Sequence, residues 1–216
     1  MPDQLSPGSS AQPPVIRGYL PSDREAVYEV CLRTAAAGGD ATGLYRDPDL
    51  MGDNFAGPYL HLEPEMAFVL DDGGRAVGYV LGTSDTAAFA AAFRRSWLPR
   101  VADRHPAPAG EPQGPDEGMA ALLHNPERMI IPALADYPAH LHIDLLPAYQ
   151  RSGHGRALLL TFLGAARRAG AKQVHLGMLT ENTAARAFYD RLDFHVIDVP
   201  DAGPLTYLGR STETED

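Results

Sequence analysis

The sequence has 216 residues, 44% of them apolar, and a formal net charge of −10 at pH 7. This length suits one domain of ordinary size, and the apolar fraction is sufficient for a core. The negative charge argues against nonspecific binding to nucleic acid or to an anionic membrane surface. Cys31 is the only cysteine, which excludes an internal disulfide and a cysteine-rich zinc site.

The two ends of the sequence differ in composition from the rest. Residues 1–14, rich in Ser, Pro, Gly and Gln, are expected to be disordered, and residues 211–216 to form a solvated acidic tail. A single domain is therefore expected over 15–210. No run of about 20 apolar residues occurs, and no basic start with an apolar run marks a signal peptide, so we expect a cytoplasmic protein.

The N-terminal half predicts a strand, a helix and then a hairpin. Ser22 and Glu25 fit the N-cap and N3 positions of a capping box, and Gly38-Gly39 fits the end of that helix. Residues 86–138, with several prolines between two helical stretches, are expected to be an insertion. In chain order the expected elements are a strand at 15–19, a helix to about Ala37, strands at 67–70 and 76–81, and helices at 87–95 and 117–124.

The C-terminal third alternates strands and helices, which predicts a layered sheet with crossover connections. The helix after the first strand carries its apolar residues on one stripe. The expected elements are a strand at 141–145, a helix at 153–169, a strand at 172–179, a helix at 183–192, a strand at 194–199 and a candidate strand at 205–208.

The segment 150–156 (Gln-Arg-Ser-Gly-His-Gly-Arg) joins a predicted strand to a predicted helix. Gly153 and Gly155 let the backbone turn tightly and approach a ligand. The first N–H groups of a helix have no intrahelical partner and, with the helix dipole, favour an anion. A dinucleotide fingerprint would need a third glycine and a Walker loop would need Gly-Lys-Ser/Thr, and both are missing. The sequence therefore predicts a phosphate-binding loop of another kind.

This loop follows Pro147-Ala148-Tyr149-Gln150, and Asn182 precedes Tyr189 by seven residues, before the turn Leu192-Asp193-Phe194. The combination resembles the acetyl-CoA signature of the GNAT acetyltransferase superfamily over 139–199, with Asp193 where the family usually has Gly. The resemblance implies an α/β (α+β) GNAT fold: a mostly antiparallel mixed sheet of about six or seven strands, flanked by helices, with splayed parallel strands at the cofactor site.

The same resemblance implies roles for individual residues. The strand residues Ile143, Asp144 and Leu145 would splay at a bulge and pair with the pantetheine arm of acetyl-CoA. Asn182 would contact the cofactor, unless it is only the N-cap of its helix, and Tyr189 would protonate the leaving thiolate, unless it only fills the core. The loop residues that would hold the pyrophosphate are Gln150, Arg151, Ser152, Gly153, His154, Gly155 and Arg156.

Segments of the N-terminal half, at 48–53, 57–60, 82–85 and 96–99, are similar to the acetyltransferase-like C-terminal domain of eukaryotic O-GlcNAcase and its bacterial homologues. No glycoside hydrolase domain is indicated. The resemblance implies that the cofactor loop is eroded in the eukaryotic domain. Gly153 and Gly155 are both present here, which favours retained binding of acetyl-CoA.

The general base and the acceptor site stay open at this stage. His140, His142 and Asp144 alternate, which places them on one face of a strand, and His142 and Asp144 are the main candidates for the base. Asp53 and His175 are further candidates for the base. Asp53, Tyr59 and Trp97 are candidates for the acceptor site, unless the two aromatic residues are core. No third ligand accompanies the two strand histidines, so no metal is expected.

The predicted function is acetyl transfer from acetyl-CoA to a small-molecule or protein amine, directly within a ternary complex. The alternative is a catalytically idle module that binds acetyl-CoA or another protein. No nucleic acid and no membrane are expected as partners. Because GNAT members are often dimers, a homodimer is among the expected assemblies.

Overall fold

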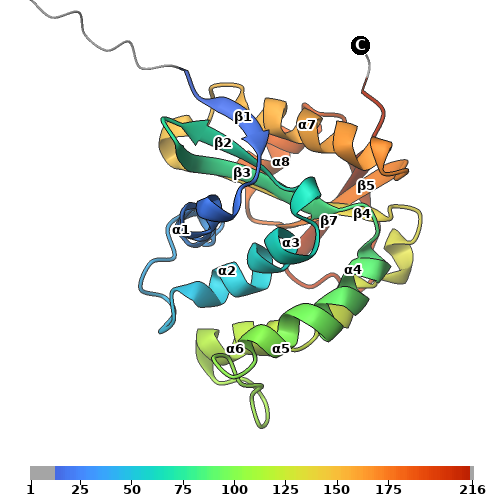
Figure 1. The fold of residues 1–216 in the computed structure, drawn as a ribbon. Helices are drawn as coiled ribbons and strands as arrows, with labels where there is room; N and C mark the ends of the chain where they lie inside the picture. Colours follow the sequence, from blue (N-terminus) through green and yellow to red (C-terminus); the bar gives the residue numbers. More distant parts are fainter. Residues whose placement is uncertain (1–12, 215–216) are drawn as a thin grey trace, which may run out of the picture.

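The computed structural model describes residues 13–214 and places them around one seven-stranded sheet (Figure 1). The strand order is β1-β2-β3-β4-β5-β7-β6, and β4–β5 is the parallel pair while the other neighbours are antiparallel. The predicted mostly antiparallel sheet is thus confirmed. The strands are β1 Val15–Gly18, β2 Phe68–Asp72, β3 Arg75–Thr83, β4 Ala139–Leu145, β5 Gln173–Leu179, β6 His195–Ile197 and β7 Leu205–Ser211.

Helices cover both faces of the sheet. α7 and α8 cover one face through apolar side chains that include Phe162, Leu163 and Tyr189, and α1 to α6 lie on the opposite side (Figure 1). On β3, Gly82 leaves no room for a Cβ, which would lie 2.5 Å from the ring of Phe162. The helices are α1 Arg24–Thr34, α2 Asp49–Phe55, α3 Gly57–Leu62, α4 Thr86–Ala92, α5 Leu98–Val101, α6 Gly114–Leu123, α7 His154–Arg168 and α8 Thr183–Asp190.

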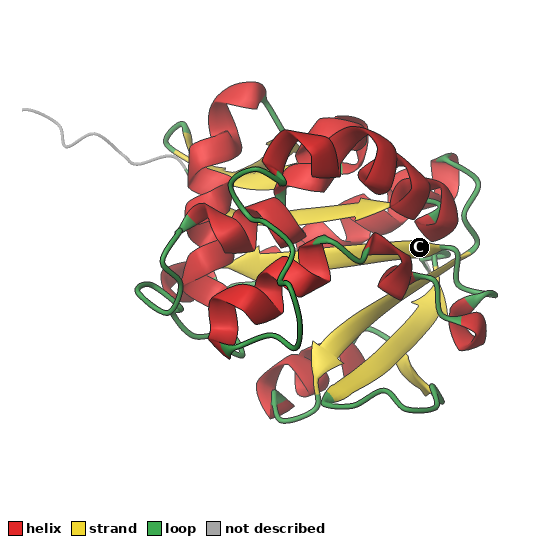
Figure 2. Cartoon of the chain, turned by 90° about the horizontal axis from the view of Figure 1, so that it is seen from below, coloured by secondary structure: helices red, strands yellow, loops and turns green. Residues whose placement is uncertain are grey.

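The sheet opens between β4 and β5. These strands pair only at Ala139–Val174 and His140–His175, and beyond this point the two groups of strands diverge (Figure 2). The predicted splay is present, but the bulge expected at 143–145 is wrong. The β3–β4 ladder runs in continuous register from Thr83–His140 to Gly78–Leu145. The opening therefore comes from the crossover through α7, which returns β5 against only the first residues of β4.

Two local expectations at the ends of the domain are wrong. Ser22 and Glu25 do not form a capping box, because α1 begins only at Arg24, after a 3₁₀ turn. The carboxylate that accepts a backbone N–H there is Asp23, which accepts from Leu20 at 2.8 Å. Residues 211 and 212 do not belong to a solvated tail, since β7 continues to Ser211 and the Thr212 hydroxyl donates to a backbone carbonyl. The disorder expected for residues 1–14 concerns mainly residues 1–12, which lie outside the part of the chain that the structure describes.

Residues 86–138 contain helices at the two predicted stretches, with α4 continuing through a π-helical turn at Phe93–Trp97 into α5, and α6 following a loop. The short helices α2 and α3 were not predicted. They pack together with α1 against β3, on the face toward which His140, His142 and Asp144 of β4 point. α2 and α3 therefore lie on the same side of the sheet as these three side chains.

Candidate functional site

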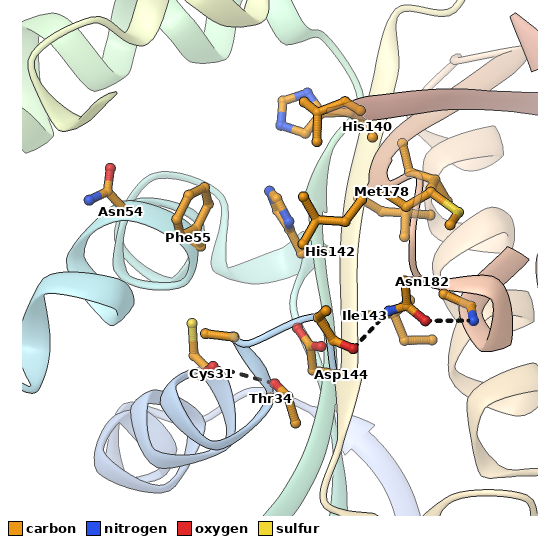
Figure 3. Close-up of a pocket in the computed structure, with 18 of the residues that line it drawn as sticks. Cys31, Thr34, Asn54, Phe55, His140, His142, Ile143, Asp144, Met178 and Asn182 are labelled. Carbon is orange, nitrogen blue, oxygen red and sulfur yellow. Dashed lines mark hydrogen bonds between the residues drawn. The ribbon is translucent and has the colours of Figure 1, made fainter. Parts of the chain in front are cut away.

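A cavity of about 760 Å³ occupies the opening of the sheet, a size typical of small-molecule sites. One wall is β4 with α1 and α2, and the other is β5 with α8 and β7. Figure 3 shows Cys31 and Thr34 from α1 and Asn54 and Phe55 from α2 facing the β4 residues, with Met178 and Asn182 on the far side. The cavity therefore lies between parts of the chain that are distant in sequence.

Asp144 lies on β4, in the wall of the cavity that β4 forms with α1 and α2. The Tyr79 hydroxyl donates to its Oδ2 at 2.7 Å. Burial raises the pKa of Asp144 from 3.8 to about 6, against the opposing effect of hydrogen bonds from Tyr79 and Thr34. A carboxylate with this pKa is ionised at neutral pH yet takes up a proton more readily than an ordinary aspartate, which is the property that a general base needs.

A chain of hydrogen bonds leads from the cavity wall into the protein and fixes the histidine tautomers. The Thr86 hydroxyl donates to the carbonyl of Pro138 at 2.8 Å, so it must accept from Nδ1–H of His140, also at 2.8 Å. His140 Nε2 then accepts from the Tyr59 hydroxyl at 2.7 Å. The Tyr59 oxygen in turn accepts from Nε2–H of His142 at 3.1 Å. By elimination, Nδ1 of a neutral His142 carries a lone pair.

Both strand histidines are neutral at physiological pH. Burial, reinforced by the charge of Arg128, lowers the pKa of His142 to about 4. Burial and the neighbouring His175 and His142 lower the pKa of His140 well below its ordinary value. His175 is held by Nδ1–H donation to the carbonyl of Tyr137 at 2.7 Å. Of the predicted bases, Asp144 is thus better matched to pH 7 than His142.

On the opposite wall, α8 contributes Asn182 and Tyr189. Asn182 is the N-cap, since its Oδ1 accepts from the backbone of Ala185 at 3.0 Å, and its Nδ2 also donates to the carbonyl of Ala37 at 3.2 Å. Tyr189 is buried, with its ring against Phe194. Burial and the charge of Asp144 raise the pKa of Tyr189. Both residues line the cavity, so the capping and packing roles coexist with access to a ligand.

The predicted phosphate loop lies beyond the end of β4 and leads into α7. Gly153 is the N-cap in the left-handed conformation, with φ of +85°. Among the described residues, no ion pair engages the exposed Arg151 and Arg156. Gln150 Nε2 donates to the carbonyl of Leu145 at 2.9 Å, which leaves that carbonyl its second lone pair for the expected pairing with a ligand.

The structure fits acetyl-CoA at three points. β4 beyond His140 has no strand partner on the side of β5, which leaves polar backbone groups there for an extended arm. The N-terminus of the 15-residue α7 presents free N–H groups and two unpaired guanidinium groups to an anion. The cavity between them has room for a thioester beside Asp144 and Tyr189.

Two predicted acceptor residues do not line the cavity. Asp53 is 0% exposed and lies in the core between the Tyr28 hydroxyl, at 2.8 Å, and the Arg104 and His105 side chains. Trp97 is also buried, and its Nε1 donates to the backbone carbonyl of Asp53 at 2.9 Å. These two predictions are wrong because the motifs that contain the residues build the core beneath the site. Tyr59 does line the cavity, as predicted.

Several lining residues escaped the sequence analysis. They include Phe55, whose ring lies 5.8 Å from that of His142, and Arg128, whose guanidinium lies 5.9 Å from the Phe55 ring centroid. Asn54, Tyr79 and Tyr207 also line the cavity. No helix among residues 13–214 is long and apolar enough to cross a membrane, and no group of three or more potential metal ligands occurs in that part of the chain.

The fold, the splayed strands and the loop define the class of protein. The sequence profile of the acetyltransferase (GNAT) family matches residues 117–194. The crystal structure of SsHAT is 59% identical, covers 94% of this chain and 100% of its own, and superposes with a TM-score of 0.91. The chain therefore belongs to the GNAT acetyltransferase family and is an acyltransferase.

Two more distant similarities are also found. Protein O-GlcNAcase of Rattus norvegicus is 26% identical over 214 residues, which are 97% of this chain and 23% of that protein. The chain thus spans about a quarter of the length of the curated relatives it matches. The structure of yncA from Salmonella typhimurium with its cofactor acetyl-CoA is 17% identical, with a TM-score of 0.54 and coverage of 95% and 97%. That likeness shows the fold alone.

Proposed function

We propose that this chain transfers the acetyl group of acetyl-CoA directly to an amine bound in the same cavity. The observation that carries the proposal is that one cavity brings Asp144 from β4 and Tyr189 from α8 to opposite walls of the opening in the sheet. A base on one side and a proton donor on the other match the two proton movements of amide formation from a thioester.

Asp144 starts the proposed step by accepting a proton from the ammonium group, which frees the nitrogen lone pair. The nitrogen forms a bond to the thioester carbonyl carbon, and the carbon–sulfur bond breaks as the intermediate collapses. Tyr189 donates to the departing sulfur, and the second proton of the nitrogen restores the phenol through solvent. The products are an amide and a thiol, and one proton is released.

The electrostatics of the two residues favour this order. The negative charge of Asp144 is one of the causes that raise the pKa of Tyr189. When Asp144 takes up the ammonium proton, that charge disappears and the phenol becomes a stronger acid. Proton uptake by Asp144 thus makes it easier for Tyr189 to donate its own phenol proton to the sulfur.

The pyrophosphate of acetyl-CoA would lie at Gly153 and the N-terminus of α7, near Arg151 and Arg156. The titration of acetyl-CoA into the protein by calorimetry tests this. Replacing Arg151 by Glu should weaken binding about tenfold or more, equivalent to about 1.4 kcal/mol, because it places an anion beside a phosphate. Arg95→Glu makes the same charge change at an exposed residue of the insertion and is the matched control. Equal affinity in both variants would remove the loop from the cofactor site.

A further inference from the structure

Arg128 is an unpaired charge in the wall of the cavity. It lies in the 3₁₀ turn Pro126–Met129, and its Nη1 is buried without a hydrogen-bond partner among the described residues. No carboxylate in that part of the chain forms an ion pair with it. Because guanidinium groups stay charged and are costly to bury unpaired, this arrangement favours an anionic partner from outside the described part of the chain.

The turn that carries Arg128 is held in place by another residue. Arg94 of the π-helical turn pairs with Glu127 and donates to the carbonyl of His124 at 3.0 Å. Glu127, the nearest carboxylate in sequence, is therefore engaged on the far side and does not neutralise Arg128. The guanidinium lies over the Phe55 ring instead, and that ring is in edge contact with His142.

The surroundings of Arg128 indicate what it binds. Its charge acts on Tyr59, His140, His142 and Tyr207, none of which is an anion at neutral pH. Burial lowers the pKa of Arg128 itself, which agrees with a site built for a counter-charge. One carboxylate would neutralise one guanidinium, whereas a dianionic phosphate would leave an excess negative charge in the cavity.

We propose, resting on the acetyltransferase function above, that the acceptor is an amine that also carries a carboxylate, which Arg128 binds. Its amine then lies toward Asp144, and its carboxylate lies at the Phe55 end of the cavity. Asn54 lies beside Phe55 (Figure 3), and its buried Oδ1, which has no partner among the described residues, would accept from an N–H of the ligand and does not bind the carboxylate. The carboxylate could belong to a small amino acid or to an acidic residue beside a lysine.

The test compares matched acceptors that differ only in the carboxylate. One arm uses ω-amino carboxylic acids of increasing length against n-alkylamines of equal length. The other uses a blocked peptide in which lysine is flanked by glutamate or by glutamine. Release of CoA thiol is measured with the wild type and with Arg128→Gln. We expect the wild type to prefer the carboxylate in at least one arm by about tenfold or more in kcat/KM, and the preference to fall to about one in the variant.

Arg100→Gln makes the same charge change at an exposed residue of α5 outside the cavity and should keep the preference. The arm in which the preference appears identifies the source of the carboxylate. Turnover without any preference, or a preference unchanged in Arg128→Gln, would overturn the inference and leave the acetyltransferase function standing.

Binding gives a readout that does not depend on turnover. Calorimetric titration of the same carboxylates into protein saturated with CoA should show binding to the wild type that is at least about tenfold weaker in Arg128→Gln. If no amine is acetylated but this binding is seen, Arg128 is a carboxylate-binding site and the proposed acetyltransferase function, with the acceptor that rests on it, fails. If no carboxylate binds, or if Arg128→Gln binds it equally well, the inference fails.

Discussion

The pH dependence of the reaction can decide which group acts as the base. For a proton taken from an ammonium group by the enzyme, kcat/KM reports the ionisation of the base in the free enzyme. If Asp144 is the base, the profile should rise with a midpoint near its pKa of about 6 and then level off. If His142 is the base, the midpoint should lie near its pKa of about 4.

Asp144→Asn removes the base while keeping an oxygen that can accept from the Tyr79 hydroxyl. Loss of a positioned base should lower kcat/KM at pH 7 by about 10²–10⁴-fold. The same change should stabilise the protein. Because burial raises the folded pKa of Asp144 above its ordinary 3.8 to about 6, ionisation costs native stability as pH rises through that window, by up to about 3 kcal/mol above pH 6. Below pH 4 the wild type and variant should melt alike.

The assay is thiol release at saturating acetyl-CoA between about pH 5 and 9, where a base with a pKa of about 4 gives a flat profile, with thermal melting from about pH 3 to 9. His142→Gln is the matched control, because it removes the other candidate and should keep the midpoint near that of Asp144. A profile that rises without a plateau up to the pKa of the amine would show that the amine enters neutral and that no base acts. Undiminished activity in Asp144→Asn would refute the assignment directly.

Two further predictions concern Tyr189 and Trp97. Tyr189→Phe keeps the ring but removes the proton, so kcat should fall about 10²-fold. The Kd of acetyl-CoA, measured by calorimetry, should change less than about threefold. Full activity of the variant would exclude the acid role, and a wild type that binds acetyl-CoA but acetylates nothing would favour a binding module. Trp97→Ala should cost about 3–5 kcal/mol of stability in chemical denaturation, because the side chain is buried and bonded to Asp53. A change in acceptor KM without loss of stability would return Trp97 to the acceptor site.

The cofactor half of the molecule was readable from the sequence because its determinants are local. Strand, loop and helix follow one another between Ala139 and Arg168, and Gly153 marks the helix start where the backbone must adopt a positive φ. Asn182 and Tyr189 share one short helix, so their spacing alone brings both to the same wall. Period two likewise placed His142 and Asp144 on one face without any tertiary information.

The N-terminal half was harder because its signals are ambiguous without tertiary contacts. α2 and α3 are seven and six residues long, too short for a periodic apolar stripe to identify a helix. Asp53 looked available for chemistry since charged residues are seldom buried unless paired. Its partners, Arg104 and His105, are about 50 residues away in the sequence, and the residues around Asp53 do not predict that pairing.

The end of the cavity at which we propose the acceptor binds is formed by residues from separate segments of the chain and not by one sequence motif. Phe55 comes from α2, Arg128 from a turn after α6, His142 from β4 and Tyr207 from β7. No one of these segments specifies the site, and none of them belongs to the loop that we propose holds the pyrophosphate. Substitutions at Phe55, Arg128 or Tyr207 can therefore alter which amine is bound while the backbone edge of β4 and the start of α7 stay unchanged. By this division, one proposed cofactor site can serve different acceptors through side-chain changes at the acceptor end of the cavity alone.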